Sequence, residues 1–180
     1  MNIKLFSILF FICNFYCFSQ NSIAELNNSA MELYKENPNK AIGILQKALS
    51  KSEAEDHLIE IARTKNNLGI VNKDLGKFEK AKALSNEALQ VKDSLILASA
   101  YNNIGACNRQ LGLYETALTN YIKALVIYEA KNDLIQQATV NNNIGMVYSY
   151  SGINDKAIEY HLKAKIVFET LENKKGISCI

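Results

Sequence analysis

A four-residue motif that occurs three times constrains the fold of this chain more than any other feature. The motif reads Asn-Asn-Leu-Gly or Asn-Asn-Ile-Gly and is called the Asn-Asn motif below; its copies start at Asn66, Asn102 and Asn142, 36 and then 40 residues apart. A glycine and two alanines follow each copy at fixed offsets, and these are Gly76, Ala81 and Ala88, then Gly112, Ala117 and Ala124, then Gly152, Ala157 and Ala164. Self-similarity at such a period indicates a chain built from repeated helical units.

The small residues of each repeat predict where two helices lie close together. Antiparallel helices approach closely where glycine or alanine replaces a bulky side chain. A glycine inside a helix costs about 1 kcal/mol relative to alanine, so the motif glycines Gly69, Gly105 and Gly145 need a packing reason. We therefore expect each to contact the second helix of its own repeat, as in a pair of Gly69 with Ala81. The next glycine along is expected to take the left-handed conformation that ends a helix.

The spacing of apolar residues predicts helices along the whole chain and no strand. A partial first repeat begins with a helix at Ile23–Leu33, and Asn37 and Pro38 suit the start of its second helix as cap and first residue. Later helix pairs are expected at 54–74 with 78–91, 94–111 with 115–131, and 133–150 with 154–173. The longer second period is expected to lengthen helices or loops where one repeat passes to the next. The prediction is an all-α, right-handed superhelical solenoid of antiparallel helix pairs over residues 22–173, with 174–180 starting an incomplete further repeat.

These offsets resemble those of the tetratricopeptide repeat family, in which a helix-turn-helix unit of about 34 residues recurs. Phe78 and Tyr114 stand two residues after the turn glycine, and Tyr121 lies at the family's second-helix aromatic position. Departures from the family pattern are Asn154, Ser85, His161, Asn72 and Asn108. The resemblance covers roughly residues 22–173 and implies a concave groove lined by the first helix of each repeat.

In this family, asparagines of the first helices often hold the main chain of an extended peptide, because an amide both donates and accepts hydrogen bonds. By resemblance, Asn66, Asn102 and Asn142 face the groove, with Asn67, Asn103 and Asn143 beside them. The alternative is that the second asparagine bonds the backbone of the neighbouring repeat and only stiffens the stack. Further groove positions implied by the resemblance are Arg63, Lys73, Asp74, Arg109, Gln110, Met146 and Tyr150. The family's carboxylate clamp is excluded, because Asn66, Thr139 and Asn143 stand where it needs lysines and an arginine.

The first 19 residues resemble a secretory signal peptide. Lys4 is followed by an apolar run from Leu5 to Ile12, and small residues at Cys17 and Ser19 favour cleavage after Ser19. The apolar stretch is shorter than the ~20 residues needed to span a bilayer. The sequence thus predicts an exported bacterial protein, periplasmic or secreted, that contacts the membrane only if this segment stays uncleaved.

The sequence contains none of the common motifs that carry catalytic residues. Phosphate loops, zinc-binding His-Glu-x-x-His, Cys-x-x-Cys and Gly-x-Ser-x-Gly are all missing from the sequence. We therefore expect no enzyme, no cofactor and no metal, with His161 a packed core histidine and Cys107 a small half-buried residue. A net charge of +2, which includes Lys4, gives no electrostatic reason to expect nucleic-acid binding.

The leading function is a non-catalytic, exported scaffold that binds a peptide or protein segment on its concave face. The alternative is the sensory input region of a larger signalling protein, a sensor histidine kinase or a membrane-bound transcription regulator, and a spacer between other domains ranks third. Apolar residues of the last repeat have no later helix to meet, which predicts self-association through Ile158, Leu162, Ile166 and Leu171. The same open end suggests a fragment, a truncated reading frame or an uncapped module.

Overall fold

The computed structural model describes residues 22–177, and the side chains of 22–171. The predicted signal segment 1–19 and its cleavage site lie outside the described residues. Within 22–177 the chain forms α-helices and one short 3₁₀ helix, without a strand. The elements are α2 (Ile23–Leu33), α3 (Pro38–Ala54), α4 (Leu58–Asp74), α5 (Phe78–Glu87), η1 (Ala88–Gln90), α6 (Ser94–Gln110), α7 (Tyr114–Ala130), α8 (Leu134–Tyr150) and α9 (Asn154–Ile177).

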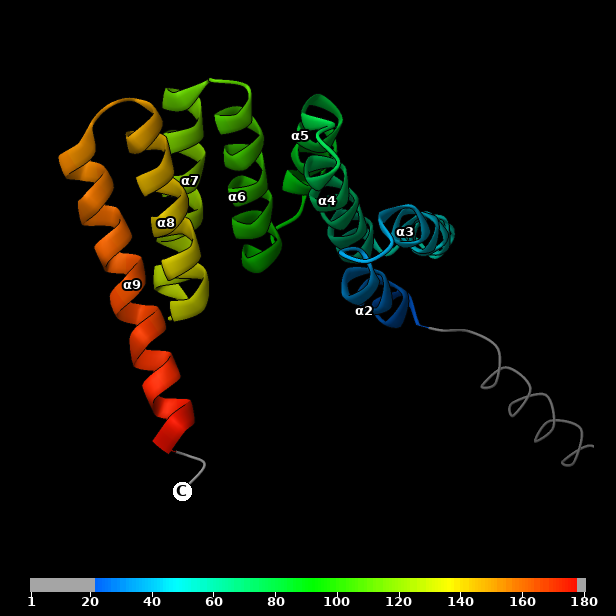
Figure 1. Cartoon of the computed structure of the whole chain (residues 1–180). Coiled ribbons are helices and arrows are strands. Elements are labelled where there is room, and N and C mark those ends of the chain that lie inside the picture. The colour runs from blue at the N-terminus through cyan, green and yellow to red at the C-terminus, as the bar shows by residue number, and fades with distance from the viewer. Residues whose placement is uncertain (1–21, 178–180) are drawn as a thin grey trace, which may run out of the picture.

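The helices form four consecutive pairs, called repeats 1 to 4 below. Repeat 1 is α2 with α3, repeat 2 is α4 with α5, repeat 3 is α6 with α7, and repeat 4 is α8 with α9. Each second helix also packs against the first helix of the next repeat, so the pairs stack along one direction (Figure 1). This arrangement confirms the predicted all-α solenoid of helix pairs. None of the helices in the described part of the chain is long and apolar enough to cross a membrane.

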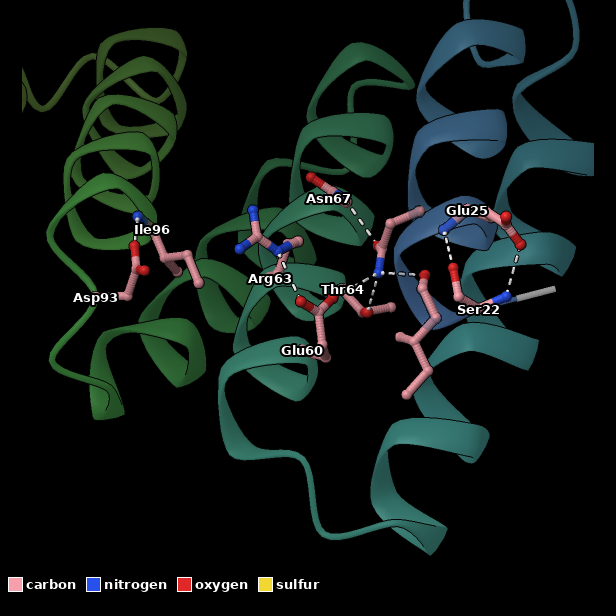
Figure 2. Close-up of polar contacts among 10 residues, drawn as sticks. Ser22, Glu25, Glu60, Arg63, Thr64, Asn67, Asp93 and Ile96 are labelled. Atoms are coloured by element: carbon pink, nitrogen blue, oxygen red, sulfur yellow. Dashed lines mark hydrogen bonds and ion pairs between the residues drawn. The ribbon is translucent and has the colours of Figure 1, made fainter. Parts of the chain in front are cut away.

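Side-chain caps start several helices, as their sequences dictate. Ser22 and Glu25 form a capping box, in which the serine hydroxyl accepts from Glu25 N and the glutamate accepts from Ser22 N (Figure 2). Asn37 accepts from Lys40 N ahead of Pro38, as expected. Asp93 and Asp133 cap α6 and α8 in the same way.

Residues with positive φ end the helices. Gly76, Gly112 and Gly152 have φ of 74°, 75° and 74°, which confirms the left-handed helix ends predicted from their spacing. Two turns between repeats use other residues for the same purpose, Asp56 with φ 54° and Asn132 with φ 53°. The turn at Asp56 separates α3 from α4, so the prediction of one helix starting at residue 54 is wrong.

The unequal repeat period is absorbed by helix length. Helix α5 has 10 residues and is followed by the 3-residue η1, whereas the equivalent α7 has 17 residues. The expected lengthening therefore occurs in the second helix of repeat 3. The boundary expected after residue 173 does not occur, because α9 runs without a break to Ile177. Whether 174–180 begin a further repeat stays a prediction.

The motif glycines lie where the helices of a repeat cross. A Cβ added at Gly69 would lie 2.5 Å from Ser85 Oγ and 3.1 Å from Ala81 O, which confirms the expected contact. A Cβ at Gly105 would lie 2.8 Å from the Tyr121 ring, and one at Gly145 would lie 2.9 Å from the His161 ring. The three helix pairs thus use glycine to admit three different side chains at the same place.

The last repeat leaves apolar side chains uncovered. Ile158, Leu162 and Ile166 of α9 are 58%, 50% and 62% exposed, as expected for a terminal helix. Leu171 is only partly exposed. Self-association through this face stays a prediction.

Candidate functional site

A cavity of about 740 Å³ lies along the first helices of the stack and is lined by all four repeats. Repeat 1 contributes the turn after α2 and the start of α3, and repeat 4 contributes α8. The lining residues are Tyr34, Lys35, Pro38, Lys73, Asp74, Leu75, Gly76, Phe78, Asn102, Ala106, Arg109, Gln110, Thr139 and Asn143. This cavity is called the groove below. Its lining therefore offers side chains of all four repeats to one ligand.

The groove carries three cations and one carboxylate. Asp74 forms ion pairs with Lys35, at 3.0 Å, and with Lys73, at 3.2 Å, and so joins repeats 1 and 2. Partial burial acts to raise the pKa of Asp74, but the hydrogen bond from Lys35 and the nearby Lys73 ammonium outweigh it and hold that pKa below its usual range. Contacts with Tyr34 and Asp74 raise the pKa of Lys35. The shifts of Asp74 and Lys35 both favour their charged forms, so these two side chains form a charged pair at neutral pH.

Arg109 is the third cation of the groove and lies in the last turn of α6. Its guanidinium carbon is 5.8 Å from the centroid of the Tyr150 ring, whose other stacking partner is Tyr114. The buried Nε of Arg109 donates to no acceptor in the structure. The guanidinium also pairs with none of the carboxylates whose side chains the structure describes, so its charge can be met by a ligand that brings an acceptor.

Two asparagines of the Asn-Asn motif lie in the groove. Asn102 Oδ1 accepts from Asn143 Nδ2 at 3.0 Å, which links repeats 3 and 4 across the groove wall. Both side chains are half-buried. A second cavity of about 390 Å³ shares Asn102 and Lys73 with the groove and extends it toward Ser99 and Gln136. Asn102 therefore borders open space on both sides.

The equivalent asparagine of repeat 2 has a different environment. Asn66 is 4% exposed, donates to Ser99 Oγ at 2.8 Å and accepts from Ser85 Oγ at 3.3 Å. Asn142, in repeat 4, is exposed and pairs with His161 Nδ1 at 2.9 Å. The expectation of three equivalent amides facing the groove is therefore wrong, because partners on neighbouring helices bury one and engage another.

The second asparagines of the motif join neighbouring repeats. Asn67 donates to Asn27 Oδ1 at 2.9 Å, and Asn27 in turn donates to Thr64 at 2.9 Å (Figure 2). Asn103 donates to Ser85 Oγ and is 3% exposed. These bonds cross between repeats as the stiffening hypothesis requires, but they end on side chains rather than on the backbone.

Three other predicted groove residues lie outside both cavities. Arg63 is exposed and pairs with Glu60 at 3.3 Å on its own helix (Figure 2). Tyr150 is 61% exposed and reaches the groove only through its contact with Arg109. Met146 Sδ accepts from Asn142 at 3.9 Å. Of the predicted set, the groove brings together Lys73, Asp74, Asn102, Arg109, Gln110 and Asn143.

Sequence reasoning missed the roles of three residues in this region, Lys35, Ser85 and Ser99. Lys35 belongs to the turn of repeat 1, and no repeat spacing marks it. Ser99 and Ser85 form hydrogen bonds with Asn66. The only sign of this in the sequence was that position 85 is a serine, where the later repeats have the rings of Tyr121 and His161.

The described side chains include no group of three or more His, Cys, Asp or Glu residues placed to hold a metal ion. Cys107 is fully buried rather than half-buried, and burial raises its pKa to about 11. His161 is packed against Gly145 but is only half-buried, so the prediction of a core histidine holds for the contact and not for the burial.

Comparison with known protein families identifies the repeats. Two models of the tetratricopeptide repeat match the chain, over residues 62–94 and 96–165. No curated protein matches the sequence.

Solved structures resemble the chain at low sequence identity. BtubC (BKLC) from P. vanneervenii superposes with a TM-score of 0.69 and 24% identity, over 86% of this chain and 67% of that one. A Rap protein complexed with competence and sporulation factor gives 0.73 and 22%, and the match covers 83% of this chain but only 45% of that one. A MamA protein gives 0.58 and 20%, over 84% and 75%. At these identities the likeness shows a shared helical repeat fold.

Proposed function

The chain belongs to the tetratricopeptide repeat family, and from this premise we propose that it is a non-catalytic module that holds an extended peptide or protein segment in its groove. Repeats of this family form protein interaction modules. The observation that carries the proposal is the groove itself, which crosses all four repeats and is open to solvent along Lys35 and Gln110.

The groove has the chemistry that an extended backbone needs. Asn102 and Asn143 place amide groups in its wall, and the carboxamide of Asn102 uses only its oxygen for the bond to Asn143. Its N–H groups are left to donate to a ligand carbonyl. A chain lying across repeats 2 to 4 would therefore find donors and acceptors that do not depend on its own side chains.

A structural neighbour supports a ligand on this type of fold. The Rap protein named above was solved in complex with competence and sporulation factor. The present chain spans less than half of that protein, so the likeness supports a binding role and leaves the ligand to experiment.

A groove-filling substitution tests the proposal. Peptides that bind the purified chain would be selected from a displayed random library, and their affinities measured by fluorescence anisotropy. Gln110→Trp places an indole in the groove from an exposed position and should weaken every selected peptide at least tenfold. Thr119→Trp adds the same bulk at an exposed position of α7, outside the groove, and should leave the affinities of the selected peptides unchanged. Equal affinities for the two variants would place the binding surface elsewhere.

We also propose that the module acts as an exported scaffold. The support is the signal-like segment 1–19, with its single lysine before an apolar run. Amino-terminal sequencing of the protein recovered from an expressing bacterium should begin at Gln20. A chain that retains Met1 in the cytoplasm would contradict export while leaving the groove proposal intact.

A further inference from the structure

The charges of the groove are unevenly compensated. One carboxylate, Asp74, faces the two ammonium groups of Lys35 and Lys73. Lys35 is largely exposed, with 70% of its side chain open to solvent, while the Lys73 side chain is 26% exposed. The two ammonium groups therefore share one counter-ion, which leaves a net positive charge at this part of the groove.

Arg109 has no counter-ion at all among the side chains of residues 22–171 that the structure describes. Its guanidinium lies against the face of Tyr150 and beside the hydroxyl of Tyr121, neither of which carries a compensating negative charge. Because no carboxylate lies beside this guanidinium, a ligand that brings one would supply the missing counter-charge. Of the protein cations, arginine is also the one that binds a carboxylate through two parallel hydrogen bonds.

Lys73 and Arg109 occupy equivalent positions in repeats 2 and 3, at the last turns of α4 and α6. Both line the groove, and Asn102 lies in the same wall with amide N–H groups to donate. Because a carboxylate accepts from several donors at once, these three side chains form a suitable set for one. We propose, building on the binding function above, that the groove selects segments carrying a carboxylate, which binds between Lys73 and Arg109.

This site differs from the carboxylate clamp considered above. The clamp positions are Asn66, Thr139 and Asn143 here, and none of them carries a charge. The cations of the proposed site lie farther along α4 and α6, next to the turns at Gly76 and Gly112.

Helix stabilisation is the competing role for these cations, since a positive charge in the last turn favours the helix dipole. That role would make Lys73 and Arg109 contribute to the melting temperature without any preference for ligand charge. A test must therefore compare ligands that differ only in charge.

The test uses three pools of fluorescein-labelled dodecapeptides, with glutamate, glutamine or lysine fixed at one central position and uncharged residues elsewhere. Each pool is made with a free and with an amidated carboxyl terminus. The full chain should bind the glutamate pool about tenfold more tightly than the glutamine pool, as expected for hydrogen bonds to a charged group. The lysine pool should bind most weakly.

Arg109→Gln should lower the affinity for the glutamate pool to that for the glutamine pool and leave the glutamine pool unchanged. Lys80→Gln removes an exposed cation of α5 that lies outside the groove, and it should preserve the preference for glutamate. A preference that follows the free carboxyl terminus in every pool would assign the site to a chain end, and one that follows glutamate would assign it to a side chain.

Equal affinities of the glutamate and glutamine pools would overturn the proposed selectivity while leaving the binding function standing. Loss of affinity for both pools in Arg109→Gln, together with a lower melting temperature, would assign Arg109 to the fold instead. Failure of every pool to bind the unaltered chain would contradict both the selectivity and the binding function.

Discussion

Ser85 in repeat 2 and Tyr121 in repeat 3 occupy equivalent positions, and each lies against the motif glycine of its repeat. The Ser85 hydroxyl is a hydrogen-bonding centre that donates to Asn66 and accepts from Asn103 of the next repeat. Tyr121 fills the same place with a fully buried ring, inside an apolar cluster that includes Val140 and Ile144 of the next repeat.

The two junctions thus differ at this equivalent position. Each also contains the other kind of contact, an apolar cluster with Ala88 and Ile96 between repeats 2 and 3, and the hydrogen bond from Asn143 to Asn102 between repeats 3 and 4. The junction of repeats 2 and 3 follows the short α5 and η1, and side-chain hydrogen bonds link its helices. The junction of repeats 3 and 4 follows the long α7, and around Tyr121 it is formed by aromatic and aliphatic packing. Gly69 and Gly105 allow the two helices within each repeat to cross closely, and the residue that faces the glycine can be polar or apolar.

Tyr121→Ala should have the largest effect on this comparison. Removing a fully buried aromatic ring typically costs about 3–5 kcal/mol, since the cavity closes only in part. Urea unfolding followed by circular dichroism would measure the loss. A cost below that of Ser85→Ala would show that the apolar junction does not depend on its ring.

Ser85→Ala should cost less, because it removes hydrogen bonds rather than a large apolar group. Asn103 Nδ2 would lose its acceptor while buried, and leaving such a group unsatisfied costs about 1–3 kcal/mol. The same unfolding experiment tests this value. Adding Asn103→Ala to Ser85→Ala should cost less than the single changes predict together, since both remove one bond; strict additivity would argue against the polar centre.

Gly105→Ala and Gly145→Ala compare an inner repeat with the last one. Alanine gains about 1 kcal/mol of helix propensity at either site. At Gly105 the new methyl meets the enclosed Tyr121 ring, and such overpacking costs about 1–3 kcal/mol, so a net loss near 1 kcal/mol is expected. At Gly145 it meets the half-buried His161 ring, which can swing outward, so stability should change little or rise. Thermal melts of the two variants should show a lower melting temperature for Gly105→Ala than for Gly145→Ala. The reverse order would contradict the difference in packing between the two sites.

The sequence predicted the repeat architecture well because that part of the fold depends on local spacing. Gly69, Gly105 and Gly145 marked the helix crossings, and the turn glycines marked the helix ends. The boundary at Asp56 was missed, since an aspartate with positive φ carries no glycine signal. The end of α9 was also missed, because the pattern of the earlier repeats favoured a turn that its own residues do not form.

The groove was predictable only in part, because burial depends on contacts between helices far apart in sequence. The resemblance located Lys73, Asn102 and Arg109 in the groove wall. It did not show that Asn66 is buried, since Asn66 bonds to Ser85 and Ser99, 19 and 33 residues away. Identical motif copies therefore differ in exposure according to what their neighbours supply.

A comparison of Asn102→Ala with Asn103→Ala tests most directly the claim that the motif serves both the groove and the stack. Calorimetric titration with a selected peptide would give affinity, and thermal melts would give stability. Asn102→Ala should weaken binding by roughly tenfold, as the loss of a hydrogen bond of about 1.5 kcal/mol predicts, with a small change in melting temperature. Asn103→Ala should lower the melting temperature and leave affinity unchanged, because its amide bonds Ser85 inside the junction. If both variants lose stability and neither loses affinity, the asparagines belong to the stack alone and the central claim is contradicted.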